Sequence, residues 1–194
     1  SPKDLKGERI VVTAGPTYEA IDPVRFIGNR SSGKMGYALA KMAARRGAEV
    51  TLISGPSSLT PPRGTRFILV ESAEELRKAV TVNLKDATIV IMAAAVADYR
   101  PKRAVSEKMK KGAGSISLDL EKTEDIISEI GRKKGKRFII GFAAETDNLW
   151  ANAKKKLKEK NLDLIIANNV KEPGAGFGVD TNIVTIIDKN GAVE

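Results

Sequence analysis

The residues best suited to chemistry lie in one short stretch, Gly28-Asn29-Arg30-Ser31-Ser32-Gly33-Lys34-Met35-Gly36. A glycine-rich loop that leads into a helix presents free backbone N–H groups and the positive end of the helix dipole, which suits a phosphate or a carboxylate. Gly28, Gly33 and Lys34 nearly match the P-loop spacing, but Met35 replaces the hydroxyl that binds magnesium there. The glycine spacing is also not that of a dinucleotide-binding loop. The stretch therefore predicts an anion site.

The composition restricts how such a site could work, because the chain of 194 residues contains neither histidine nor cysteine. This excludes Ser-His-Asp and Cys-His catalysis, His-ligated metals and disulfides. Catalysis would depend on Lys, Arg, carboxylates, amides and backbone dipoles, with a hard cation held mainly by substrate phosphates. The lack of cysteine favours a cytoplasmic protein. No apolar run approaches the roughly 20 residues of a membrane span, and no signal peptide opens the chain.

The net charge of +9 and the pI of about 9.7 leave three interpretations open. They are a nucleic-acid-binding surface, a solvated lysine-rich surface, and a pocket for a polyanionic small molecule. Only 5% of the residues are aromatic, and no nucleic-acid-binding motif is recognisable, so nucleic acid is the least favoured partner.

The elements that would position the anion loop alternate between short apolar runs and amphipathic segments. This pattern predicts a single α/β domain with a doubly wound, mostly parallel, Rossmann-like sheet. Ser72 and Thr123 are the expected N-caps of two helices, with Glu75 completing a capping box. The expected strands are residues 9–14, 49–54, 66–70, 87–95, 138–144 and 162–167, and two further helices are expected over 33–46 and 148–160.

Two segments depart from this alternation. Residues 102–120 are too long for a tight turn, so we expect an arm or flap that leaves the sheet, with a half-exposed strand over 115–120. Residues 182–188 and the turn at Asn190-Gly191 predict the start of a C-terminal hairpin, within which the chain would be truncated.

Ligands of such sheets bind beyond the carboxyl ends of the strands. Gly15, Asn29, Ala94-Ala95 and Asp98 would gather there. Asp98 has the position of a catalytic or ribose-binding carboxylate, and the alternative is a turn-former ahead of a proline. Arg25 could hold a carboxylate or phosphate in a bidentate manner.

Lysines supply further candidate contacts to phosphates. At about 100° per residue, Leu149, Ala153, Lys156 and Lys160 share one helical stripe that should face the sheet. The two lysines could bind phosphates or simply extend along the edge of the stripe. Lys108 and Lys110 would share one side of an extended arm, where a solvated charge run is the simpler interpretation.

These motifs resemble phosphopantothenoylcysteine synthetase, the synthetase half of a bifunctional coenzyme A biosynthesis flavoprotein, and the resemblance covers essentially the whole chain. Glu124 departs from the family, in which many members have proline. The stretches that carry the resemblance are Thr13-Ala14-Gly15-Pro16-Thr17, Asp22-Pro23-Val24-Arg25-Phe26-Ile27-Gly28-Asn29, Ser31-Ser32-Gly33-Lys34-Met35-Gly36, Ala94-Ala95-Val96-Ala97-Asp98-Tyr99, Glu107-Lys108-Met109-Lys110-Lys111, Lys122-Thr123-Glu124-Asp125-Ile126, Gly141-Phe142-Ala143-Ala144-Glu145-Thr146 and Lys160-Asn161-Leu162-Asp163-Leu164-Ile165.

The resemblance implies a CTP-dependent ligase that joins 4′-phosphopantothenate to L-cysteine through an acyl-cytidylate. It implies that Lys108 stabilises charge during cytidylate formation and that Asn29 holds the acyl group. The implied phosphopantothenate ligands are Arg25, Asn29, Ser31, Ser32 and Gly33, and Gly15 and Thr17 would belong to a phosphate loop. The implied CTP-binding positions are Ala94, Ala95, Asp98, Lys108, Glu124, Asp125, Ile126, Ile127, Phe142, Lys156 and Lys160.

The resemblance further implies Mg²⁺ or Mn²⁺ held mainly by the CTP phosphates, with no residue assigned as a metal ligand, and a homodimer whose flap reaches the partner's site. An N-terminal decarboxylase domain would have been separated at the polar start of the chain. Two other functions remain as alternatives. A dinucleotide-binding reductase shares the sheet but needs an acidic residue where Ser54 ends the second strand, and a basic nucleic-acid-binding module would use the charge.

Overall fold

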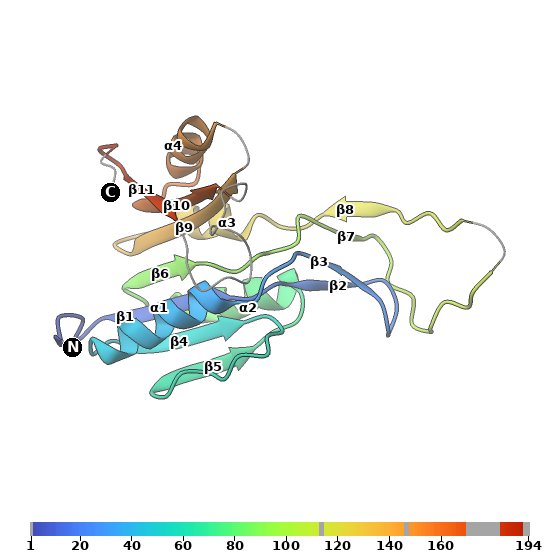
Figure 1. The fold of residues 1–194 in the computed structure, drawn as a ribbon, viewed down its shortest axis with the longest axis horizontal. Helices are drawn as coiled ribbons and strands as arrows, with labels where there is room; N and C mark the ends of the chain where they lie inside the picture. The colour runs from blue at the N-terminus through green and yellow to red at the C-terminus, as the bar shows by residue number, and fades with distance from the viewer. Residues whose placement is uncertain (1, 113–114, 146–147, 170–182, 192–194) are drawn as a thin grey trace.

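The computed structural model describes residues 2–112, 115–145, 148–169 and 183–191. Within them, one sheet of seven strands has the order β11-β10-β9-β6-β1-β4-β5 (Figure 1). Its neighbouring strands are parallel, except that β11 is antiparallel to β10, so the predicted α/β class is confirmed. The strands are β1 (Arg9–Ala14), β4 (Glu49–Ser54), β5 (Thr65–Leu69), β6 (Ile89–Met92), β9 (Phe138–Glu145), β10 (Leu164–Asn169) and β11 (Val184–Asp188).

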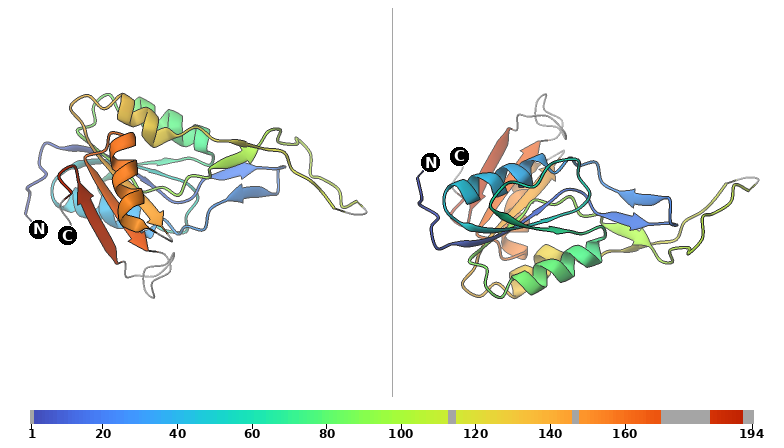
Figure 2. Two further views of the ribbon diagram at one scale, coloured as in Figure 1. Left: turned by 90° about the horizontal axis from the view of Figure 1, so that it is seen from above. Right: turned by 90° about the horizontal axis from the view of Figure 1, so that it is seen from below.

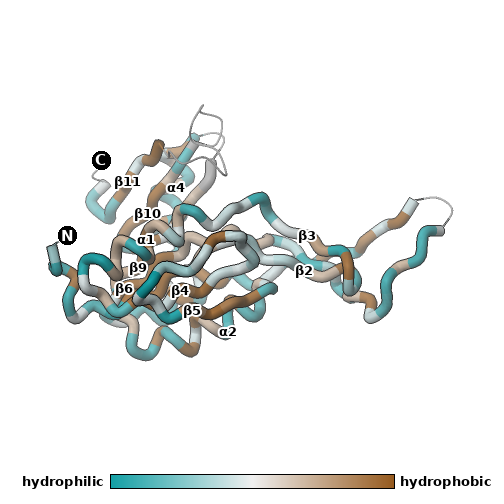
Figure 3. The backbone as a smooth tube through the Cα atoms, turned by 60° about the horizontal axis from the view of Figure 1, so that its bottom comes forward, coloured by the Kyte–Doolittle hydropathy of each residue, from teal (hydrophilic) through white to brown (hydrophobic). Residues whose placement is uncertain are grey.

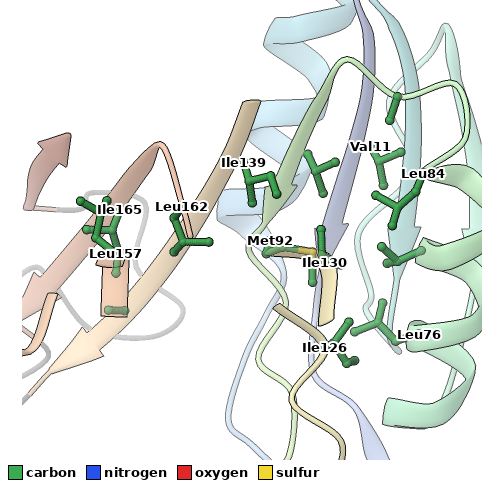
Figure 4. Close-up of a cluster of buried hydrophobic side chains, with 14 of the residues drawn as sticks. Val11, Leu76, Leu84, Met92, Ile126, Ile130, Ile139, Leu157, Leu162 and Ile165 are labelled. Atoms are coloured by element: carbon green, nitrogen blue, oxygen red, sulfur yellow. The ribbon is translucent and has the colours of Figure 1, made fainter. Parts of the chain in front are cut away.

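Successive strand residues point to opposite faces of this sheet, and both faces are apolar. Helices therefore cover both faces. On one face, α1 (Lys34–Arg45) packs Tyr37 and Ala40 in the same core cluster as Val12 and Leu52. On the other face, residues of three helices share the cluster of Val11 (Figure 4). These helices are α2 (Ala73–Asn83), α3 (Ile126–Arg132) and α4 (Leu149–Glu159). In the described part of the chain, no helix is long and apolar enough to cross a membrane.

Of the two predicted helix N-caps, one is confirmed and one is wrong. Ser72 caps α2 as expected, since its side chain accepts the N–H of Glu75. The prediction for Thr123 is wrong, because Asp125 is the N-cap of α3 and accepts the N–H of Ser128. The hydroxyl of Thr123 instead donates to the carbonyl of Ala97, so it holds a neighbouring loop.

Two hairpins interrupt the sheet at neighbouring positions. The first, β2 (Tyr18–Ala20) with β3 (Phe26–Gly28), follows β1, and the second, β7 (Tyr99–Pro101) with β8 (Leu120–Lys122), follows β6. Strands β1 and β6 are adjacent, so both hairpins leave the same end of the sheet. They project side by side away from it in Figure 1 and in both views of Figure 2.

The arm, residues 102–120, connects β7 to β8 and leaves the sheet as predicted, with Leu120 opening β8. The predicted strand over 115–120 is wrong, since residues 115–119 are not in a strand. Its apolar members Ile116 and Leu118 are 61% and 42% exposed. An alternating pattern stabilises a strand only where one face is buried, and no other described element covers a face of this segment.

The central strand and the C-terminal strand also differ in part from expectation. The predicted strand over 87–95 is shorter, because β6 ends at Met92 and the following residues turn toward β1. Strand β11 and a turn in which Gly191 donates to the carbonyl of Asp188 lie where the C-terminal hairpin was expected. Its residue 182 and the residues after Gly191 lie outside the described residues.

Candidate active site at the carboxyl ends of the strands

The loops after β1 and β6 are joined directly at the point where the strand order reverses. Pro16 and Ala95 form a parallel bridge, the N–H of Ala95 donates to the carbonyl of Gly15 at 2.8 Å, and the N–H of Thr17 donates to that of Ala95 at 3.2 Å. Such a switch point is where ligands of open α/β sheets bind. Gly15, Ala94 and Ala95 are thus brought together as the sequence predicts.

Hydroxyls of threonines in and just after β1 form hydrogen bonds with the loop after β6. The hydroxyl of Thr13 accepts the N–H of Ala94 at 3.1 Å, and that of Thr17 accepts the N–H of Ala97 at 2.9 Å. The hydroxyl of Thr123, which lies between β8 and α3, donates to the carbonyl of Ala97 at 2.6 Å. Thr17 is only 1% exposed, so its hydroxyl braces this loop, and a contact with phosphate stays a prediction.

Sequence reasoning assigned this bracing to none of the three threonines. A signal was available for Thr13, which is the one polar residue in the apolar run 10–14. The structure shows it fully buried. A buried hydroxyl needs a hydrogen-bond partner, and the adjoining loop supplies it.

The side-chain amide of Asn29 links the anion loop to the loop after β6. Its Nδ2 donates to the carbonyl of Val96 at 2.8 Å. The anion loop lies close to β1, because a Cβ on Gly36 would come within 2.5 Å of the Ala14 Cβ. The N-cap Gly33 has φ = 80°, a left-handed conformation that glycine adopts without strain. The Asn29 amide and the start of α1 therefore share one corner of the sheet.

The serine hydroxyls of the anion loop are bonded locally. The Oγ of Ser31 accepts the N–H of Gly33 at 3.3 Å, and the Oγ of Ser32 accepts the N–H of Lys34 at 3.4 Å. Two N–H groups at the helix start thereby have side-chain partners in this state, and a bound anion would compete with the serines for them.

The predicted nucleotide residues divide by exposure. Asp98 and Glu124 are exposed, whereas Phe142 is half-buried. Ile126 is buried, so it can offer only backbone groups to a ligand, and Ile127 is half-buried against the same core. Asp98 is positioned through its own carbonyl, which accepts the N–H of Thr123 at 3.0 Å.

The helical stripe predicted to face the sheet lies on α4, and its two lysines are half-buried. Ala153 and Leu157 are buried, Lys156 and Lys160 are half-buried, and Lys160 forms an ion pair with Asp125 at 3.2 Å. Burial raises the pKa of Asp125, but hydrogen bonds from Ser128 and the Lys160 ammonium outweigh it and hold the pKa below its usual value. The structure thus joins two predicted nucleotide positions across α3 and α4.

Lys108 is the predicted catalytic residue that the structure places apart from the others. It is exposed within the arm, which projects beyond the sheet. Among the described residues, its ammonium makes no hydrogen bond or ion pair. Arg25, in the turn before β3, is 46% exposed and pairs with Asp22 at 2.7 Å.

Two further observations concern what the site could hold. In the described part of the chain, no three acidic side chains gather as they would to cage a metal ion. A cavity of about 520 Å³ lies elsewhere, between α4 and the turn after β11, and its lining includes none of the predicted site residues.

Comparison with known proteins shows what the chain is similar to. It is 56% identical over 188 residues to the coenzyme A biosynthesis bifunctional protein CoaBC of Bacillus subtilis (strain 168), a match covering 96% of this chain and 46% of that protein. It is 50% identical over 194 residues to a cysteine/cysteine sulfinic acid decarboxylase from an unknown prokaryotic organism, covering 99% and 54%. The chain therefore spans about half the length of these curated relatives.

A solved structure agrees with these relatives. The crystal structure of the C-terminal domain of a coenzyme A biosynthesis bifunctional protein CoaBC superposes with a TM-score of 0.84 at 47% identity, covering 100% of this chain and 87% of that one. A family model for the DNA/pantothenate metabolism flavoprotein C-terminal domain matches residues 5–194. The chain belongs to this family of flavoprotein C-terminal domains.

Proposed function

We propose that this chain is a CTP-dependent ligase that joins 4′-phosphopantothenate to L-cysteine in coenzyme A biosynthesis. The observation that carries the proposal is the hydrogen bond of 2.8 Å from Asn29 to Val96. It joins the loop expected to bind the acyl substrate to the loop expected to bind the nucleotide. A carboxylate held by the first loop would therefore lie next to a nucleotide held by the second. The name of the Bacillus subtilis relative is consistent with this pathway.

The chemistry has two steps. In the first, an oxygen of the phosphopantothenate carboxylate attacks the α-phosphate of CTP, and pyrophosphate leaves. In the second, the cysteine amine attacks the acyl carbon of the cytidylate, CMP leaves with the carboxylate oxygen, and the amine proton goes to solvent. These steps need charge neutralisation and alignment more than a general base, which suits a chain without histidine or cysteine.

Each predicted residue has a role in these steps. Arg25, Ser31, Ser32, Gly33 and the start of α1 bind phosphopantothenate, with Asn29 holding the acyl group. Backbone groups at Ala94 and Ala95 contact the cytosine. Gly15 and Thr17 complete a phosphate loop. Lys108 neutralises charge on the α-phosphate as pyrophosphate leaves. The remaining nucleotide contacts come from Asp98, Glu124, Asp125, Ile126, Ile127, Phe142, Lys156 and Lys160.

Magnesium or manganese would arrive on the CTP phosphates. Mg²⁺ retains several waters and is commonly held by substrate phosphates with one or two carboxylates. Asp98 is an exposed carboxylate at the proposed nucleotide loop and could supply one ligand. The cation would neutralise the triphosphate and orient the leaving pyrophosphate.

We further propose a cytoplasmic homodimer in which the arm of one copy reaches the other copy's site. The projecting hairpins and arm carry exposed apolar side chains, visible as brown stretches in Figure 3, which a partner could cover. They are Val24, Phe26, Tyr99, Val105, Ile116, Leu118 and Leu120. In full-length relatives the other half of the chain would supply the decarboxylase.

The test of the dimer mixes two inactive variants, Lys108→Gln and Asn29→Asp. If the arm serves the partner's site, subunit exchange creates one intact site in each mixed dimer and restores about a quarter of the wild-type activity. Failure to restore activity after demonstrated exchange would show that each site is built within one chain.

The test of the function is pyrophosphate release with CTP, phosphopantothenate, cysteine and Mg²⁺. We expect release and a phosphopantothenoylcysteine product with the full mixture, and neither when CTP is omitted. Reduction of a carbonyl substrate by NADPH would favour the reductase alternative instead. Salt-sensitive binding of DNA or RNA without ligation would favour the nucleic-acid-binding module.

A further inference from the structure

Asp22 is a buried carboxylate at the outer end of the first hairpin, where most side chains are exposed. Its side chain has no accessible surface. Its Oδ1 accepts the N–H groups of Val24 and Arg25, both at 2.8 Å, which closes the turn between β2 and β3. Its Oδ2 accepts the Arg25 guanidinium at 2.7 Å and the N–H of Met109 at 3.2 Å. One carboxylate therefore connects the hairpin to a residue 87 positions later.

The guanidinium of Arg25 binds the other backbone polar group of Met109. Its Nη1 and Nη2 donate to the carbonyl of Met109 at 3.3 and 3.4 Å. Both backbone polar groups of one arm residue are thus bound by the Asp22–Arg25 pair. A second attachment lies four residues earlier, where the N–H of Val105 donates to the carbonyl of Ile21 at 2.9 Å.

The attached residue is the direct neighbour of Lys108. An unattached arm would let the Lys108 ammonium sample many positions, and fixing a residue costs conformational entropy. Interactions that fix it before substrate binds reduce what must be ordered during the reaction.

We propose that Asp22 is a positioning residue, which fixes the backbone at Met109 and thereby places the Lys108 ammonium for cytidylate formation. This inference rests on the proposed function for the role of Lys108. The attachment itself is independent of that role, so the two can be tested apart.

The first test is hydrogen exchange of the arm amides in the wild-type chain. The N–H groups of Val105 and Met109 have acceptors, whereas Lys108, Lys110 and Lys111 donate no backbone hydrogen bond in the described structure. We expect Met109 to exchange at least about tenfold more slowly than its lysine neighbours. Equal exchange rates would overturn the proposed attachment, whatever the activity of the chain.

The second test is Asp22→Asn, which keeps the shape of the side chain. The asparagine oxygen can still close the turn, but its NH₂ group meets two donors, the Met109 N–H and the Arg25 guanidinium. We expect Met109 exchange to accelerate about tenfold and single-turnover pyrophosphate release to slow roughly 10- to 30-fold. Asp119→Asn, the same change at an exposed arm position, is the matched control and should change neither.

The third test separates positioning from a general structural effect by a double-mutant cycle. If Asp22 acts through Lys108, Asp22→Asn should slow pyrophosphate release by less than about twofold in a Lys108→Gln background. A full multiplication of the two losses would overturn the proposal. Absence of CTP-dependent pyrophosphate release in the wild type would refute the proposed function, and the exchange pattern would remain as the test of the attachment.

Discussion

The two ends of the parallel strands differ in how they satisfy their polar groups. At the amino ends of β9 and β10, Asp163 accepts the Lys134 ammonium at 2.6 Å, the Lys189 ammonium at 2.7 Å and the N–H of Ile139 at 2.8 Å. At the carboxyl ends of β1 and β6, hydrogen bonds of the Thr13 and Thr17 hydroxyls and of the Asn29 amide join the loops. In the described structure, the ionic groups of Lys108 and Asp98 have no partner there.

We infer that the cluster at the amino ends serves stability and that the groups at the carboxyl ends serve ligand binding. Burial raises the pKa of Asp163, but the two lysines and the Ile139 N–H hold it below its usual value, so this carboxylate stays ionised and paired. A closed cluster of this kind ties strands together and leaves no charge for a ligand. An end with available cations and amides can bind an anionic substrate.

The largest effect should be on the rate of cytidylate formation, after a substitution in the arm that leaves the cluster at the amino ends of the strands unchanged. Lys108→Gln removes the charge that is proposed to neutralise the α-phosphate as pyrophosphate leaves, so cytidylate formation should slow about 10²- to 10³-fold. Rapid-quench measurement of pyrophosphate gives the rate, and the melting temperature should not change. Lys110→Gln, two residues along the arm, is the matched control, and an undiminished rate for Lys108→Gln would remove its assigned role.

The converse change is Asp163→Asn at the amino end. It leaves Lys134, whose side chain is 10% exposed, without its counter-charge. Breaking a buried pair from one side should lower the free energy of unfolding by roughly 3 kcal/mol. Urea unfolding measures this loss, and turnover per folded molecule should stay unchanged. Glu159→Gln, at an exposed pair, should cost almost nothing, and equal costs for both variants would contradict the comparison.

A smaller effect, on both stability and nucleotide binding, should follow a change at the loop after β6. Thr123→Val removes the hydrogen bond to the carbonyl of Ala97, which should cost about 1 kcal/mol of stability. Because the loop is proposed to bind the nucleotide, the KM for CTP should also rise several-fold. Thr123→Ser, which keeps the hydroxyl, should restore both values, and a Thr123→Val enzyme with unchanged KM would disconnect this loop from CTP.

The smallest effect should come from the ion pair between Glu74 and Arg77 on the surface of α2. The Arg77 guanidinium lowers the pKa of Glu74 to about 2 from 4.5. Because the folded-state pKa is lowered, the stabilisation is complete above about pH 4.5 and is lost as the pH falls toward 2. Glu74→Gln should lower the melting temperature by about 1–3 °C at pH 7 and by less at pH 3. A constant difference across this range would contradict the assigned pairing.

The strongly patterned elements were predictable from the sequence. Apolar β-branched runs identify β1 and β4 at their observed bounds, and the glycine after α1 marks its end. Gly47 adopts φ = 97° and donates to the carbonyl of Ala44, as in a common helix-ending motif. These features depend on local geometry, which residue type and spacing determine directly.

The contacts that link distant segments were not predictable in the same way. Thr123 has the residue type of an N-cap, but its hydroxyl bonds to a loop 26 positions earlier. The arm pattern over 115–120 predicts a strand, but among the described residues no other element covers a face of this segment. The residue type and spacing of Asp22 indicate no distant partner. Its bond to Met109 depends on two insertions leaving adjacent strands, which is a property of the folded sheet.

The most direct test of the account follows the oxygen atoms of the substrate. Phosphopantothenate labelled with ¹⁸O in its carboxylate should be converted with CTP and cysteine, and the products analysed by mass spectrometry. The account predicts one ¹⁸O in each CMP formed and none in pyrophosphate. Recovery of ¹⁸O in inorganic phosphate, with CDP as the nucleotide product, would contradict activation at the α-phosphate and with it the proposed acyl-cytidylate.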